Sequence, residues 1–211
     1  MNFTVDVISD VICPWCWIGK RRLEKAIASL GQPVKVRWFP FQLNPTMPKE
    51  GISRREYRTK KFGSWERSLE LDAQVAAAGD TEGIDFAFDK MERTPNTLDA
   101  HRLIWLAEKE GVQDAVVEAL FRAYFTDGRD ISQRQTLLDV VAAAGLHRSK
   151  AESVMNSNEG TEALREADEL GRRYRVDGVP FFIVNGKTTL SGAQPPDAFL
   201  EALSKEVRVV S

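Results

Sequence analysis

The chain has 211 residues, enough for one elaborated domain whose core needs no disulfide staples. Its 29 basic and 31 acidic residues nearly cancel, so charge gives no reason to expect nucleic acid or an anionic membrane as a partner. No stretch approaches the roughly 18 apolar residues of a membrane-spanning helix, and the N-terminus lacks a secretory signal pattern. We therefore expect a soluble, cytoplasmic protein.

The first forty residues predict a strand, a helix and a second strand. Residues 3–9 form a short β-branched run suited to a buried strand. Residues 17–31 carry apolar side chains at helical spacing and end in a glycine, and residues 34–41 read as a second strand. A helix between two such strands usually joins parallel neighbours, so we expect a right-handed β-α-β unit.

The middle of the chain predicts a different, helical region. A turn-rich stretch at residues 42–52 is followed by helical patterns, with no convincing strand between them, at residues 64–79, 96–111, 114–125, 132–145 and 159–176. Ser132 and Gln135 have the spacing of a capping box, and Gly145 is placed to end that helix. We interpret this region as a helical subdomain inserted into another domain.

The C-terminal part returns to an α/β pattern. Residues 181–184 and 188–190 predict two short strands, and the Asn185-Gly186 pair between them is a strong hairpin signal. Residues 194–207 predict a closing helix with proline in its first turn. The expected organisation is therefore a discontinuous domain of residues 1–42 and 175–211 around an inserted helical subdomain of residues 43–174.

Cys13 and Cys16 are the only cysteines, and they lie at the junction of the first strand and its helix. In a reducing cytoplasm such a pair is more often redox-active, catalytic or metal-binding than structural. Unpaired N–H groups and the helix dipole favour a thiolate at Cys13, and Pro14 suits the first helical turn. Cys16 is one turn further in and is expected to be more buried. The spacing predicts that Cys13 attacks and Cys16 resolves the mixed disulfide.

A metal site and simple packing are the structural alternatives for the two cysteines. Zinc needs four ligands, and the chain adds only His101 and His147, on separate helical segments without metal-like spacing. Two thiols packed as small apolar residues are disfavoured at a strand-to-helix junction. We therefore expect neither a metal nor an organic cofactor, only a redox-active disulfide.

Other noticeable residues have less specific interpretations. His101 shares a helical face with apolar residues, which favours a core or boundary histidine. Trp15 is a candidate substrate-facing residue at the edge of the site, and Trp17 is interpreted as a packing residue. Asp10 has two open roles, as a local cap or as a negative charge that opposes a thiolate. A basic cluster interrupted by glutamates is interpreted as a solvated face: Arg54, Arg55, Arg58, Lys60, Lys61 and Arg67.

Five stretches carry a family resemblance: SDVICPWCWIG, FQLNP, NTLDAHRL, VDGVPFFIVNG and SGAQPP. Over nearly the whole chain they resemble the DsbA family of thioredoxin-fold disulfide oxidoreductases, and most closely its cytosolic FrnE-like branch. The resemblance implies an α/β, thioredoxin-like fold with an inserted all-helical subdomain. It also implies that Pro180 is cis and packs beside the cysteines, and that Val179 offers its backbone to a substrate peptide as an added strand.

Motif and resemblance together predict a thiol–disulfide oxidoreductase, of oxidase or isomerase type, that acts on protein or peptide thiols. The expected catalytic residues are Cys13, Cys16 and Pro180. The expected substrate contacts are Pro14, Trp15 and Val179. Glutathione is a candidate redox partner.

Two alternative functions stay open. One is a glutathione-dependent isomerase or kappa-class-like glutathione transferase, which resembles this fold but typically needs only the first active-site position, so that Cys16 argues against it. The other is a non-enzymatic redox-sensing adaptor that holds a partner through the helical subdomain.

Overall fold

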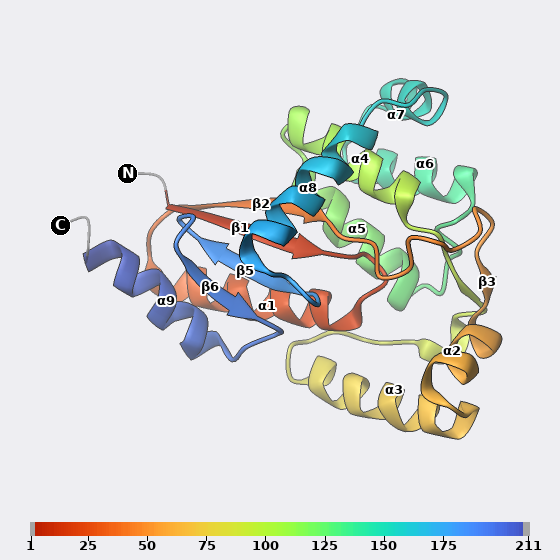
Figure 1. Cartoon of the computed structure of the whole chain (residues 1–211), viewed down its shortest axis with the longest axis horizontal. Coiled ribbons are helices and arrows are strands. Elements are labelled where there is room, and N and C mark those ends of the chain that lie inside the picture. Colours follow the sequence, from red (N-terminus) through yellow and green to blue (C-terminus); the bar gives the residue numbers. More distant parts are fainter. Residues whose placement is uncertain (1–2, 209–211) are drawn as a thin grey trace.

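A four-stranded mixed sheet forms the centre of the computed structural model, which describes residues 3–208 (Figure 1). The strands lie in the order β2-β1-β5-β6, with bounds β1 (Phe3–Ser9), β2 (Val34–Pro40), β5 (Phe181–Val184) and β6 (Thr188–Ser191). β1 runs parallel to β2 and antiparallel to β5, which pairs antiparallel with β6. The predicted β-α-β unit and C-terminal hairpin are both confirmed.

Helices cover both faces of this sheet. α1 (Pro14–Leu30) and α9 (Pro196–Arg208) pack together on one face, and α8 (Thr161–Tyr174) crosses the other (Figure 1). Alternate residues of β5 serve the two sides: Phe182 packs with the α1 and α9 cluster, and Phe181 with a smaller cluster that includes Leu170 of α8. Because β5 is buried on both faces, all four of its residues are apolar.

Between β2 and β5 the chain forms the helical insertion, so the thioredoxin-like fold with an inserted helical subdomain is observed. Its α-helices are α2 (Arg54–Phe62), α3 (Trp65–Asp80), α4 (Leu98–Lys109), α5 (Gln113–Phe125), α6 (Arg134–Ala143), α7 (Arg148–Met155) and α8. α2 and α3 lie beside the N-terminal end of α1, where the cysteines are (Figure 1). Trp17 of α1 stacks on Phe121 and Phe125 of α5, which anchors α1 to the insertion.

The insertion differs from its sequence prediction in three places. A two-stranded antiparallel sheet, β3 (Ile52–Ser53) with β4 (Arg93–Thr94), lies where no strand was expected. The pairing is two residues long and therefore leaves no alternating pattern to recognise. The short helices α2 and α7 were also not predicted. α2 is highly polar, so it lacks the apolar periodicity by which helices are recognised.

The predicted capping box at Ser132 and Gln135 is wrong. α6 begins at Arg134, and its N-cap is Gln133. Ser132 instead bonds Asp130: its backbone N–H donates to Asp130 Oδ1 at 2.9 Å and its hydroxyl donates to the same oxygen at 2.6 Å. An aspartate that bonds the backbone two residues on forms a local turn, and this turn occupies the serine before the helix starts.

Candidate active site

Cys13 is the N-cap residue of α1. β1 ends at Ser9, and the Cys13 N–H then donates to the Asp10 carbonyl oxygen at 3.0 Å, which closes a tight turn between strand and helix. Pro14 is the first residue of the helix, where its missing N–H removes no helical hydrogen bond. The Cys16 N–H donates to the Cys13 carbonyl oxygen at 3.0 Å, so both cysteines belong to the first turn.

The loop before β5 brings Val179 and Pro180 to this turn. The Val179–Pro180 peptide bond is cis, as the resemblance implied. The Cys13 thiol donates to the Val179 carbonyl oxygen at 3.5 Å, across 166 residues of sequence. Gly19 permits this approach, because a Cβ atom there would lie 2.9 Å from Phe182 Cζ and 3.2 Å from Pro180 Cγ. The fold therefore brings Val179 and Pro180 to the turn that holds the other four predicted site residues, the two cysteines with Pro14 and Trp15 between them.

The two thiols have different surroundings. Cys16 has no exposed surface and Cys13 is 5 % exposed, so Cys16 is the more buried thiol, as expected. Burial raises the pKa of the Cys16 thiol well above its ordinary value, and the neighbouring Cys13 raises it further. Cys13 is more enclosed than a strand-to-helix junction suggested, because it belongs to the buried cluster that joins α1 to the insertion. It also lines a pocket.

Pro14 and Trp15, the other two predicted contacts, line the rim of that pocket. Trp15 is 40 % exposed, which is unusual for so large an apolar side chain. Trp17 is buried, and its Nε1–H faces Glu118 at 3.3 Å, in keeping with the packing role expected of it.

Asp10 and His101 form a buried pair under the active-site turn. His101 Nε2 lies 3.2 Å from Asp10 Oδ1, and the Leu43 N–H donates to Asp10 Oδ2 at 2.8 Å. The Asp10 side chain therefore holds the loop that follows β2, whereas its backbone oxygen, already described, holds Cys13. The Asp10 carboxylate does not cap α1, so the first of the two roles considered for Asp10 is not observed. His101 is a satisfied core histidine, as the apolar face of its helix favoured.

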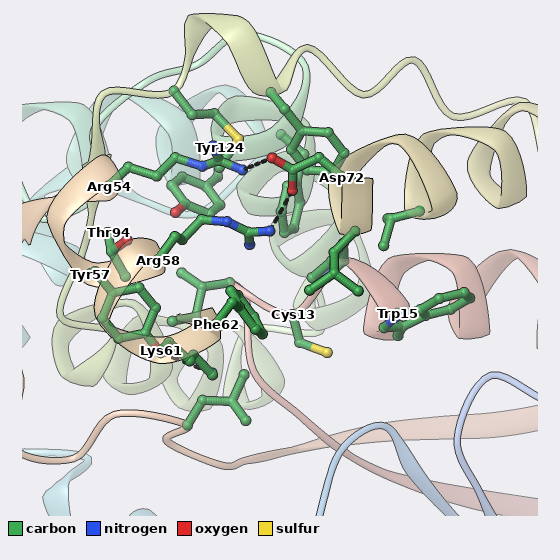
Figure 2. Close-up of a pocket in the computed structure, with 18 of the residues that line it drawn as sticks. Cys13, Trp15, Arg54, Tyr57, Arg58, Lys61, Phe62, Asp72, Thr94 and Tyr124 are labelled. Atoms are coloured by element: carbon green, nitrogen blue, oxygen red, sulfur yellow. Dashed lines mark hydrogen bonds and ion pairs between the residues drawn. The ribbon is translucent and has the colours of Figure 1, made fainter. Parts of the chain in front are cut away.

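A pocket of about 420 Å³ opens beside Cys13 (Figure 2). One wall is the active-site turn from Ile12 to Trp15, and the rest comes from the insertion: the loop after β2, helices α2 and α3, the segment from Phe88 to Thr94 and the end of α5. Most of the lining is apolar. No single segment of the insertion predicts this cavity, because its walls come from six separate stretches of chain, five of them in the insertion.

Two arginines of the predicted solvated face line this pocket, and for them that interpretation is wrong. Arg54 Nη2 and Arg58 Nη2 each lie 2.7 Å from a different oxygen of Asp72 (Figure 2). The Arg54 and Asp72 side chains are only 4 % and 8 % exposed, and that of Arg58 is 17 % exposed. The glutamates between the basic residues had indicated a solvated face. The ion pairs could not be predicted from the sequence, because the partner Asp72 lies on α3 and the pairing depends on how α2 and α3 pack.

Among the side chains that the structure describes, those of residues 3–205, no group of three or more from histidine, cysteine, aspartate or glutamate is arranged to hold a metal ion. In the same range, no helix is long and apolar enough to span a bilayer.

Known proteins resemble this chain along almost its full length. The probable DsbA oxidoreductase from Streptomyces coelicolor is 29 % identical, with a TM-score of 0.90 over 98 % of this chain and 90 % of that one. YwbO of Bacillus subtilis, an uncharacterized protein, is 27 % identical over 209 residues, 98 % of each chain. The cytosolic disulfide reductase DsbM from Pseudomonas aeruginosa, solved with GSH, shares the fold at 20 % identity, with a TM-score of 0.69 over 97 % of this chain and 99 % of that one.

A family model described as a DSBA-like thioredoxin domain matches residues 4–204. This range contains the cysteine pair, the whole helical insertion and the cis-proline loop. The protein therefore belongs to the DsbA-like thioredoxin family and is a thiol–disulfide oxidoreductase of the DsbA type.

Proposed function

We propose that this protein exchanges disulfides with protein or peptide thiols through Cys13 and Cys16, as an oxidase or isomerase in the cytoplasm. The observation that carries the proposal is the contact of 3.5 Å between the Cys13 thiol and the Val179 carbonyl oxygen. It joins a thiol at a helix N-terminus to a backbone segment that an extended peptide can pair with.

The two cysteines have separate roles. The Cys13 thiolate attacks a substrate disulfide, a Cys13–substrate bond forms, and one substrate sulfur leaves as a thiol. The Cys16 thiol then loses its proton, attacks the Cys13 sulfur and releases the second substrate thiol. The reverse sequence oxidises a substrate dithiol. The burial of Cys16 supports this division, because it leaves Cys13 as the sulfur that an incoming substrate reaches.

The substrate-contacting residues are Pro14, Trp15 and Val179, with Pro180 packed beside the sulfur. Trp15 is exposed and apolar beside the reactive thiol, which suits an unfolded or flexible peptide. No cofactor is needed, because the cysteine pair itself accepts two electrons as a disulfide and donates them as a dithiol. Glutathione is a candidate redox partner, and its presence in the DsbM structure supports that choice.

The deciding experiment traps the intermediate. Cys16→Ser expressed in the source cell should accumulate protein partners as adducts that are visible on a non-reducing gel and removed by dithiothreitol. Cys13→Ser, the matched control, should form none. Absence of adducts from Cys16→Ser, with full glutathione-dependent turnover of a small electrophile, would instead establish the transferase alternative. A redox-dependent partner without turnover of insulin would establish the adaptor.

A further inference from the structure

The pocket beside Cys13 has the size and polarity of a small-molecule site. Its volume of about 420 Å³ falls in the range of roughly 300–1,000 Å³ that is usual for such sites. Side chains such as Ile12, Phe62, Val75 and Phe88 make most of its surface apolar. The helical insertion encloses it on the sides away from Cys13, so it is too confined for a folded protein surface and suits one end of a small molecule.

The charge in this pocket is unbalanced. Of the described residues that line it, Arg54, Arg58 and Lys61 are cationic and Asp72 alone is acidic. Asp72 receives one guanidinium on each oxygen, at 2.7 Å in both cases. Lys61 Nζ donates to the Tyr57 hydroxyl at 2.9 Å, which adds no negative charge. The pocket thus has an excess of positive charge over the one carboxylate that it contains.

Two further observations indicate that a ligand completes this region. Burial lowers the pKa of the Arg58 guanidinium, Asp72 offsets only part of this, and the like charge of Arg54 adds to the lowering, so an added anion would stabilise both cations. Asn44 Nδ2, on the wall of the same pocket, is the only buried side-chain polar atom without a hydrogen-bond partner among residues 3–205, whose side chains the structure describes. Its amide oxygen is already occupied by the Tyr57 hydroxyl at 2.6 Å. A buried donor of this kind normally has an acceptor.

We propose that the pocket binds a low-molecular-weight disulfide with an anionic group on an apolar body, and that this compound is the co-substrate that reoxidises the cysteine pair. The anionic group lies toward Arg58 and Lys61, and the apolar body fills the space that leads to Cys13. The inference rests on the proposed function, since it assigns the redox partner of the same two thiols. Protein substrates use the exposed side of the site, at Trp15 and Val179.

The proposed step is balanced. The Cys13 thiolate attacks one sulfur of the small disulfide, a Cys13–sulfur bond forms, the disulfide bond breaks and the first thiolate leaves. Cys16 then gives up its proton and attacks Cys13, which releases the second thiolate. The protein dithiol loses two electrons and two protons, and the small disulfide gains them as two thiols.

Two aromatic disulfides of similar size test the inference. Dithiobis(nitrobenzoate) carries a carboxylate on each ring, whereas dithiodipyridine is neutral. The reduced protein is mixed with each, and the rate constant of thiol release is measured by stopped flow. Arg58→Gln should slow the reaction with the carboxylate probe about ten-fold, the worth of one charge-assisted hydrogen bond, and leave the neutral probe unchanged. Arg55→Gln, an exposed site on the same helix that does not line the pocket, is the matched control and should change neither rate.

Lys61→Gln covers the case in which Arg58→Gln fails to fold, because Lys61 is exposed and outside the buried ion pairs. Lys61→Gln should slow the reaction with the carboxylate probe and leave the reaction with the neutral probe unchanged. Added salt should have the same selective effect on the unmodified protein. Equal responses of the two probes to Arg58→Gln and Lys61→Gln, or an equal effect of Arg55→Gln, would overturn the inference. Failure of the proposed function looks different: neither probe would react faster with the unmodified protein than with Cys13→Ser.

Discussion

The two sides of the Cys13 pocket are built in different ways. On the sulfur side, formed by the active-site turn and the loop before β5, the backbone decides the geometry: a helix N-cap, a tight turn and a cis peptide bond bring Cys13 to Val179. On the cover side, formed by α2 and α3, ion pairs between side chains decide it. Backbone geometry thus positions the sulfur of Cys13, whereas the charges that would select the proposed small ligand belong to side chains that other residues can replace.

The largest loss of stability should come from removing the shared carboxylate of the cover side. Asp72→Ala leaves two mostly buried guanidinium groups without their shared carboxylate, which should lower the free energy of unfolding by about 3–5 kcal/mol. Urea unfolding followed by circular dichroism measures it. The folded variant should still react with dithiodipyridine at the original rate, because Asp72 does not touch the sulfur side.

An exposed ion pair nearby provides the control for this change. Glu70→Ala removes the partner of Arg67 on α3, where both side chains are more than half exposed, and should cost less than about 0.5 kcal/mol. If Asp72→Ala is as mild as Glu70→Ala, the cover does not depend on its buried charges, and the comparison fails.

The Asp10 carboxylate holds the loop that follows β2, so its removal should loosen that loop, whereas the backbone bond to Cys13 is kept. Asp10→Ala leaves the Leu43 N–H and the His101 ring without their buried partner, which should cost about 2–3 kcal/mol. Asp10→Asn keeps an acceptor for Leu43 and should recover part of this loss. Amide hydrogen exchange at Leu43 is the specific readout: it should accelerate in Asp10→Ala and stay slow in Asp10→Asn, and no difference between them would contradict the assigned contact.

Gly19 tests how closely the sulfur side is packed. Gly19→Ala places a Cβ atom 2.9 Å from Phe182, which is fully buried, so we expect a loss of about 1–3 kcal/mol from overpacking. Gly171 lies inside α8 with its nearest neighbour at 3.9 Å, and Gly171→Ala should gain about 0.5–1 kcal/mol from helix propensity. Thermal unfolding of the two variants should therefore shift in opposite directions. A gain in both would show that α1 does not need its close approach to Pro180.

The smallest effect concerns the buried thiol. Because the pKa of Cys16 is raised in the folded protein, only the unfolded chain releases this proton as the pH passes the ordinary thiol value near 8.5. The stabilising contribution is complete below that pH and is lost as the pH rises toward the folded pKa. In a Cys13→Ser background it should decrease by about 1 kcal/mol by pH 9. Unfolding curves of Cys13→Ser with and without Cys16→Ala measure the difference, and parallel pH profiles would contradict the burial effect.

Local signals made the sulfur side predictable. The strand before Cys13, proline in the first helical turn and the Asn185-Gly186 hairpin each follow from a few neighbouring residues. The place of Val179 beside Cys13 did not follow from such signals, and it entered through the family resemblance. The roles of the six predicted site residues stay predictions until the variants are made.

What the sequence determined by itself is the set of strongly periodic elements and the position of the cysteine pair on one of them, because those depend on hydrogen bonds and side-chain spacing within a short stretch. Only the tertiary structure decided that Arg54 and Arg58 face a pocket, that Asp10 meets Leu43 and His101, and that Cys13 lines one pocket together with the insertion. Those contacts join residues far apart in the chain. The identity of a charged residue does not show whether solvent or a buried partner compensates its charge. The packing of α2 and α3 against the end of α1 decides that Arg54 and Arg58 pair with Asp72 and not with solvent.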